Sequence, residues 1–186
     1  MFLEPAIAMI ELKSIAKGIL ATDALVKKAP VRILETHPIC PGKYMILFAG
    51  EVGDVEEALK AGVAAGGDGI INDLFLPYVH RDIIPAITGT QEVKEFGAIG
   101  VIETFSIVST VMAADIAAKM APVRLTEIRL AQGLGGKGYF IMTGELFDVE
   151  AALEAARNHA AKEGMLAACE IIQSPHPDLI SKGIYW

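Results

Sequence analysis

The chain has 186 residues, of which 53% are hydrophobic and 21% are charged, and its formal net charge is −7. A chain this apolar buries a sizeable core, which excludes a disordered protein, and its acidic balance excludes the basic face that a nucleic-acid partner requires. No apolar run reaches the roughly 18–20 residues that span a bilayer, and the N-terminus is unlike a signal peptide, so we expect a cytoplasmic protein without a membrane partner.

The strands of the first half are indicated by apolar, β-branched runs bounded by proline, glycine and polar residues. We expect them over residues 5–13, 30–37, 43–50 and 69–76. A loop rich in proline and glycine, residues 38–42, joins the second strand to the third, and a short helix begins near His80.

Two longer helices are expected between these strands. Ser14 is placed to cap a helix that runs to about Lys28 with apolar residues at helical spacing. Asp54, with Glu57 three positions on, forms a capping-box-like start for a helix through about Gly66. The first half therefore predicts the order β-α-β-β-α-β.

The second half of the chain repeats the first. Matching segments lie 92 residues apart and, past a two-residue insertion, 94 apart; they include Ala6–Glu11 with Ala98–Glu103, Asp23–Lys27 with Asp115–Lys119, and Asp54–Glu56 with Asp148–Glu150. A period of roughly 90 residues is too long for a solenoid unit and indicates a duplicated domain. We expect domains over 5–90 and 97–182, each an α+β, ferredoxin-like antiparallel sheet with helices packed against it.

The motifs of this repeat resemble those of a known family. The first half contains "IELxSIAxG…DALVKKA" within residues 7–29 and "GKYMILFAGEVGDVEEALKAG" at residues 42–62, and the second half carries the same marks at 99–121 and 136–156. Both halves resemble bacterial-microcompartment shell domains (BMC domains) in unpermuted order. The resemblance covers nearly the whole chain and occurs twice.

The chain is more closely similar to the tandem-domain shell proteins of propanediol-utilisation compartments, because it carries "ICPGK" at Ile39–Lys43. In that family this loop points to the central pore of a flat tile. The resemblance implies a pseudo-hexameric homotrimer that tiles edge to edge with other shell proteins in a polyhedral shell. It also implies one [4Fe-4S] cluster per trimer, bound by Cys40 of three copies, an electron relay across the shell, and enclosed redox enzymes as further partners.

Cys40 is the candidate metal ligand among only two cysteines, neither of which belongs to a CxxC pair. A lone cysteine is more often an inert apolar residue, and Cys169, in an apolar run, is expected in the core. Iron–sulfur clusters need several thiolates, so one chain is insufficient, whereas a three-fold axis supplies three. His37 is a candidate fourth ligand, although strand geometry carries it away from the axis. The alternative is a vacant thiol-lined pore.

The pore is expected to be lined by two loops that alternate around the axis. Its residues are Ile39, Cys40, Pro41, Gly42, Leu134, Gly135 and Gly136. Glycines let the backbone approach an axis closely. Lys43 and Lys137 follow the loops, where they either offset the negative charge of a cluster or are solvated residues at the starts of strands.

Lys27 and Lys119 are repeat mates, and the resemblance implies that both lie at the edge of the tile. The alternative is a solvated lysine at the end of a helix, where the helix dipole favours it. The arginine that completes the seam in the family is replaced here by Tyr78 and Ser174, which leaves the strength of sheet formation open.

His80 and His176 are repeat mates, and each precedes an aspartate by two residues. No nucleophile recurs beside them, so we interpret them as helix-start residues and expect no enzymatic activity. Two alternatives to the cluster-bearing tile remain open. One is a shell tile with an open metabolite pore, and the other is a thiol-based redox or ligand-binding oligomer.

Overall fold

The computed structural model describes residues 5–93 and 95–184. The first residues, on which the expectation of no signal peptide rests, and Lys94 of the join between the repeats lie outside the described part. The chain divides into two compact units, residues 1–79 and 80–186, and each is described by itself.

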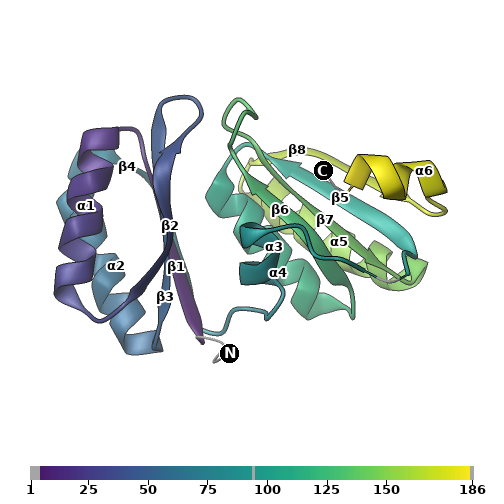
Figure 1. Cartoon of the computed structure of the whole chain (residues 1–186), viewed down its shortest axis with the longest axis horizontal. Helices are drawn as coiled ribbons and strands as arrows, with labels where there is room; N and C mark the ends of the chain where they lie inside the picture. The colour runs from purple at the N-terminus through teal and green to yellow at the C-terminus, as the bar shows by residue number, and fades with distance from the viewer. Residues whose placement is uncertain (1–4, 94, 185–186) are drawn as a thin grey trace. The chain divides into compact units, whose positions relative to one another are not determined.

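The first unit is a four-stranded antiparallel sheet in the order β2-β3-β1-β4. Two long helices lie on one face of this sheet (Figure 1). The elements are β1 (Ala6–Leu12), α1 (Ile15–Lys28), β2 (Arg32–Ile39), β3 (Lys43–Gly50), α2 (Val52–Gly66), η1 (Gly67–Gly69) and β4 (Ile70–Leu76).

The second unit repeats this arrangement with the sheet order β6-β7-β5-β8. Its elements are α3 (Ile83–Thr88), β5 (Ala98–Thr104), α4 (Ile107–Met120), β6 (Arg124–Leu130), β7 (Gly138–Gly144), α5 (Leu146–Lys162), β8 (Leu166–Ile172), α6 (Pro177–Leu179) and η2 (Ile180–Ile184). The predicted α+β class and the doubled β-α-β-β-α-β order are therefore confirmed.

The core of the first unit lies between its sheet and its helices. Alternate residues of β1, Ala8 and Ile10 among them, point to the helices because side chains alternate along a strand. Helix α1 meets them with Gly18, Ala21 and Leu25, which are spaced by three and four residues and form one buried stripe. The opposite side of α1 is exposed and carries both polar and apolar side chains.

The two predicted helix starts have different outcomes. The Ser14 hydroxyl accepts a hydrogen bond from the backbone N–H of Lys17 at 3.3 Å, which confirms Ser14 as the cap of α1. The predicted capping box at Asp54 is wrong, because β3 ends at Gly50 and α2 already begins at Val52. Asp54 lies inside the first turn, where the helix dipole favours an acidic side chain.

The short helix expected near His80 begins at Ile83 and packs in the second unit. Ile83, Ile84, Ala86 and Ile87 are all buried. The sequence repeat and the compact units thus divide the chain at different places: α3 belongs to the first repeat by sequence and to the second unit by its contacts. No helix in the described part of the chain is long and apolar enough to cross a membrane.

Candidate functional site

Cys40 lies in the tight turn between β2 and β3. The last pair of this antiparallel ladder is Ile39 with Lys43, so residues 40–42 alone reverse the chain. The Cys40–Pro41 peptide bond is cis, and Gly42 has a φ of +76°, which a glycine adopts without strain. Ile39 is buried, Cys40 is half-buried, and Pro41 and Gly42 are exposed, so the thiol stands near the tip of an exposed turn.

The equivalent turn of the second unit connects β6 to β7 and has no thiol. It contains three glycines with positive φ, Gly133 (72°), Gly135 (61°) and Gly136 (91°). Leu134 is half-buried, Gly135 is exposed and Gly136 is buried. A Cβ at Gly133 or Gly135 would meet nothing within 4 Å, so these glycines serve the backbone conformation of the turn.

The lysines that follow the two turns are paired within their own sheets. Lys43 Nζ lies 2.7 Å from Glu11 Oε1, and the Glu11 side chain is fully buried. Lys137 makes the equivalent pair with Glu103. Each lysine charge is therefore matched by a carboxylate of its own sheet, a third arrangement beside the two that the sequence left open.

Within the described residues, no group of three or more His, Cys, Asp or Glu side chains is placed to hold a metal ion, at Cys40 or elsewhere. Both ring nitrogens of His37 are engaged: Nε2 lies 3.2 Å from Glu35 Oε2, and Nδ1 lies 3.1 Å from the Pro38 carbonyl oxygen. Cys169 lies on β8 and is half-buried, not in the core as expected. A multi-thiolate site at Cys40 therefore requires other copies of the chain.

A buried carboxylate, which the sequence analysis missed, stands near the second turn. Glu127 on β6 is fully buried; it pairs with Arg129 and accepts a hydrogen bond from the Thr90 hydroxyl at 3.2 Å. Burial, and then the charge of Glu127, raise the pKa of Tyr139. Arg129 and Tyr139 line a pocket of about 180 Å³ beside Leu134. The sequence repeat could have indicated this site, because Glu127 and Arg129 are the repeat mates of Glu35 and His37.

The candidate tile-edge lysines make identical contacts in the two units. Lys27 Nζ lies 2.6 Å from Asp23 Oδ2 on α1, and Lys119 Nζ lies 2.6 Å from Asp115 Oδ2 on α4. Both lysines occupy the last turn of their helix, where the dipole favours a positive charge.

The sequence predicted that both paired histidines are helix-start residues; His176 is one, whereas His80 lies three residues before α3, which begins at Ile83 after its N-cap Asp82. The backbone N–H of Asp178 donates to Nδ1 of His176 at 3.1 Å, which makes His176 the cap of α6. The backbone N–H of Asp82 donates to Nδ1 of His80 at 3.3 Å in the same way. This shared role is a structural one.

Comparison with known proteins gives the same picture over both halves of the chain. The family model described as "BMC domain" matches residues 6–79 and 98–175. The bacterial microcompartment shell protein PduT of Citrobacter freundii is 38% identical over 174 residues, which cover 94% of this chain and 95% of that protein. The crystal structure of a microcompartment protein from Desulfitobacterium hafniense is 40% identical, with a TM-score of 0.89, and the match covers 96% of this chain and 99% of that one.

A shorter relative matches about half of the chain. The carboxysome shell protein CsoS1A of Hydrogenovibrio crunogenus is 32% identical over 90 residues, which are 47% of this chain and 94% of that protein. About half of this chain is thus equivalent to one whole shell protein. Together with the doubled fold and the two family matches, this shows that the chain belongs to the BMC-domain family and is a tandem-domain shell protein of a bacterial microcompartment.

Proposed function

We propose that three copies of the chain close into a pseudo-hexameric ring that serves, in the cytoplasm, as a flat tile of the microcompartment shell. Residues 5–90 and 97–182 act as its two shell domains. Lys27 and Lys119 stand at the tile edges, where the tile meets other shell proteins. Cys40 of the three copies holds one [4Fe-4S] cluster on the central axis, and the tile relays electrons across the shell to redox enzymes inside.

The placement of Cys40 carries this proposal. The thiol lies near the tip of an exposed turn, and two of the neighbouring positions are an exposed proline and an exposed glycine. Such a turn has little bulk with which to bury a thiol, unlike the usual apolar setting of an unreactive cysteine. A ring of three copies then brings one thiolate per chain to the axis, and one iron is left for water or a small ligand.

The second turn fits the same axis without adding a ligand. The pore-lining residues alternate around the axis as two sets, Ile39, Cys40, Pro41 and Gly42 from the first turn and Leu134, Gly135 and Gly136 from the second; of these, Ile39 and Gly136 are buried within their own chain. A bound cluster supplies one-electron chemistry, and the chain's own residues position it and keep solvent from its sides. A pore filled in this way does not conduct metabolites.

The cluster is tested on protein purified without oxygen. We expect brown protein with about four iron and four sulfide atoms per three chains, as one [4Fe-4S] cluster requires. Cys40→Ala removes the colour and the iron, and the matched variant Cys169→Ala retains both, because Cys169 lies on β8, away from the turn.

Other outcomes separate the alternative functions. Colourless native trimers that still form sheets contradict the cluster and identify a tile with an open pore. A colourless oligomer that reduces or binds small molecules, and whose activity is lost on alkylation of Cys40, identifies a thiol-based oligomer and contradicts the whole proposal.

A further inference from the structure

The pocket beside the second turn is built from residues of one unit only. Arg129 on β6 and Tyr139 on β7 are cross-strand partners, and with Gln132 and Leu134 they line a pocket of about 180 Å³. Glu127, two residues before Arg129, lies on the same face of β6 because side chains alternate along a strand. The pocket therefore combines a guanidinium, a phenol and an apolar side chain beside a fully buried carboxylate.

The buried carboxylate holds the guanidinium in place. Glu127 pairs with Arg129 Nε, and Arg129 Nη2 donates to the Thr90 hydroxyl at 3.3 Å. The Thr90 hydroxyl in turn donates to Glu127 Oε1 at 3.2 Å, so a residue of the join between the repeats completes the network. These bonds use the Nε side of the planar guanidinium. Its Nη1 end is therefore left for a molecule in the pocket, and the Arg129 side chain is 39% exposed.

The proton of the Tyr139 hydroxyl is also directed toward the carboxylate. The hydroxyl donates to Glu127 Oε2 at 3.5 Å. Burial, and then the charge of Glu127, raise the pKa of Tyr139, so the proton stays in place. A phenol oxygen that donates its single proton can still accept a hydrogen bond. The pocket thus offers the N–H groups of Arg129 next to an acceptor oxygen of Tyr139 and the apolar side chain of Leu134.

The first unit has a different pair at the equivalent place. The repeat mates of Arg129 and Tyr139 are His37 and Met45, which are cross-strand partners in the same register. Both ring nitrogens of His37 are engaged, by Glu35 and by a backbone carbonyl, and Met45 is fully buried. The fold therefore accepts either pair at this position, and packing alone does not require the guanidinium and the phenol of the second unit.

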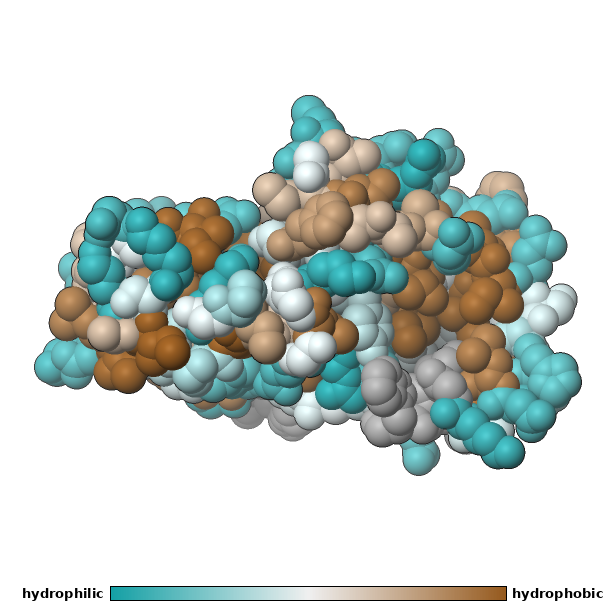
Figure 2. Space-filling model, turned by 90° about the horizontal axis from the view of Figure 1, so that it is seen from above, coloured by the Kyte–Doolittle hydropathy of each residue, from teal (hydrophilic) through white to brown (hydrophobic). Residues whose placement is uncertain are grey.

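The size and place of the pocket limit what can enter it. It lies by the turn between β6 and β7, which stands at the upper edge of the second unit in Figure 1. Figure 2 views the molecule from this side, and both polar and apolar residues reach the surface there. A cavity of roughly 150 Å³ holds one benzene molecule, so a pocket of about 180 Å³ admits a ligand of about six non-hydrogen atoms.

We propose that this pocket binds a small neutral molecule that carries a hydrogen-bond donor beside an acceptor, as a primary amide or an alcohol does. The acceptor oxygen of the ligand receives an N–H of Arg129, its donor reaches the Tyr139 oxygen, and its apolar part packs against Leu134. A carboxylate lacks the donor, and it would add an uncompensated charge because Arg129 already neutralises Glu127. The site is complete within one chain, so it goes beyond the proposed ring and cluster and does not depend on them.

Three probes of equal size test the ligand class on the full-length protein. Isobutyramide carries a donor beside an acceptor, isopropyl methyl ketone carries the acceptor alone, and isobutyrate carries a negative charge and no donor. Titrations followed by ligand-detected NMR measure the three dissociation constants. We expect millimolar binding of isobutyramide, because so small a ligand makes few contacts, and binding weaker by about tenfold for the ketone and the carboxylate.

Two variants locate the bound probe. Arg129→His combined with Tyr139→Met installs the pair of the first unit, so the fold is retained and the saturable binding of isobutyramide is lost. Tyr139→Phe keeps the aromatic ring and weakens binding by about fivefold, as the loss of one hydrogen bond requires. Tyr78→Phe, which removes an exposed hydroxyl of the first unit, is the matched control and leaves the dissociation constant unchanged. The unfolding temperature of each variant shows that its sheet has formed.

The outcomes test this site separately from the cluster. Isobutyramide that does not saturate the native protein overturns the proposal, and so does binding that Tyr139→Phe and the paired variant leave unchanged. Isobutyrate that binds more tightly than isobutyramide overturns the neutral ligand class. Cys40→Ala retains the binding of isobutyramide even where it removes the iron, whereas binding that is lost with Cys40 places the probe at the first turn and contradicts this site.

Discussion

Lys43 and Lys137 occupy the same place after the two turns, but they neutralise carboxylates in different surroundings. Glu11 is fully buried and lies 2.7 Å from Lys43, whereas the Glu103 side chain beside Lys137 is 37% exposed. A charge that stays buried after its partner is removed costs far more than one that water reaches, because water stabilises the exposed charge. The repeat therefore allows the same substitution, the removal of a lysine, to be compared beside a buried carboxylate and beside a partly exposed one.

We predict that Lys43→Met lowers the free energy of unfolding by about 3–5 kcal/mol, since it leaves the Glu11 carboxylate buried without its ion pair. Lys137→Met is the matched control and lowers it by about 1 kcal/mol or less. Urea unfolding, followed by circular dichroism at one fixed protein concentration, measures both values. If the two variants lose the same free energy of unfolding, the burial of the carboxylate does not determine the cost of removing its lysine, and the prediction is wrong.

At this scale the sequence predicted residue types better than residue contacts. The sequence singled out Cys40, the paired histidines and the candidate tile-edge lysines, because each recurs or stands out within a motif. It did not predict the pairs of Lys43 with Glu11 or of Arg129 with Glu127, since partners across a sheet depend on strand order and register. Strand order is set by packing over the whole unit, which no local pattern encodes.

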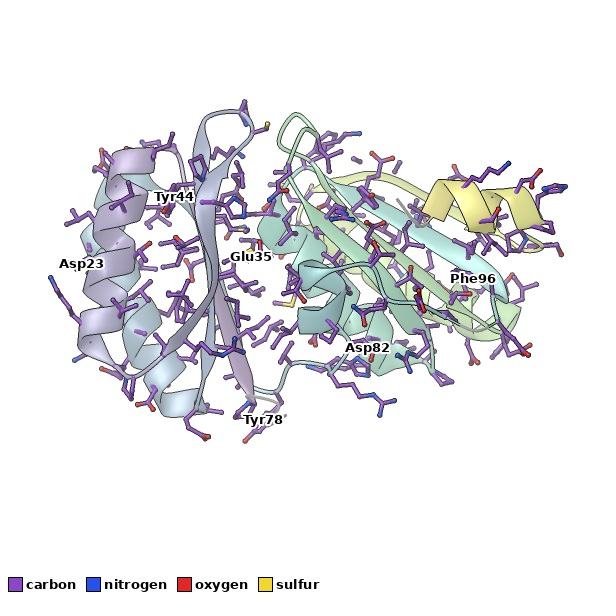
Figure 3. All side chains as sticks on the ribbon, in the orientation of Figure 1. Asp23, Glu35, Tyr44, Tyr78, Asp82 and Phe96 are labelled. Carbon is purple, nitrogen blue, oxygen red and sulfur yellow. The ribbon has the colours of Figure 1, made fainter. Side chains whose placement is uncertain are left out.

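At the level of the elements, the same contact between a helix and a strand pairs a large residue with a small one in both units, but the large residue lies on the strand in the first unit and on the helix in the second. Gly18 on α1 faces Tyr44 on β3, and Thr110 on α4 faces Gly138 on β7. A Cβ on Gly18 would lie 2.7 Å from Tyr44 Cβ and still closer to its ring. Tyr44 lies between α1 and the sheet (Figure 3). The space between helix and sheet is therefore filled by a side chain of the strand in the first unit and by a side chain of the helix in the second.

We predict that Gly18→Thr alone destabilises the first unit by about 1–3 kcal/mol or more, because it forces extra atoms into a packed contact. Tyr44→Gly alone is destabilising as well, since it opens a cavity. In the double variant we expect a favourable coupling of about 1–3 kcal/mol, because the second unit already uses the Thr and Gly pair.

A double-mutant cycle in urea measures this coupling, and the reverse exchange in the second unit, Thr110→Gly with Gly138→Tyr, is the matched cycle. Additive losses in both cycles would show that the two units pack their helices independently of this contact.

The pattern of hydrophobic residues predicted the eight strands and four long helices found in residues 5–93 and 95–184, because each has a clear period and a bounded length. It failed at the start of α2. The spacing of Asp54 and Glu57 resembles a capping box, but the helix already begins at Val52. It also did not indicate that α3 packs in the second unit. A short apolar helix shows which side it buries, but not which sheet it covers.

At the scale of the whole molecule, the negative net charge favours separation of neighbouring tiles, whereas contacts at the proposed tile edges favour their association. Each chain has a net charge of −7, which adds up over the copies of a tile and makes neighbouring tiles repel. Lys27 and Lys119 stand on exposed helix ends, with side chains that are 72% and 45% exposed. In the proposed tile, these lysines would reduce the repulsion where two tile edges meet.

We predict that Lys27→Ala combined with Lys119→Ala abolishes flat sheets at low salt and leaves the mass of the native particle unchanged. Exposed ion contacts contribute up to about 1 kcal/mol each, and a tile has several edges, so the concentration needed for sheet growth rises by about tenfold or more. Electron microscopy over a concentration series, with native mass spectrometry of the same samples, measures both effects.

Lys60→Ala provides the matched control for this prediction. Lys60 is an exposed helix lysine that pairs with Glu56 at 2.9 Å, so its loss changes the net charge without touching the helix ends. Added salt shortens the Debye length to about 3 Å at 1 M, which weakens the repulsion between the acidic tiles and restores part of the sheet formation in the double variant. Sheets that form equally well in the double variant and in the Lys60 control would place these lysines away from the edges, and the apolar residues of the helices would then have to join the tiles.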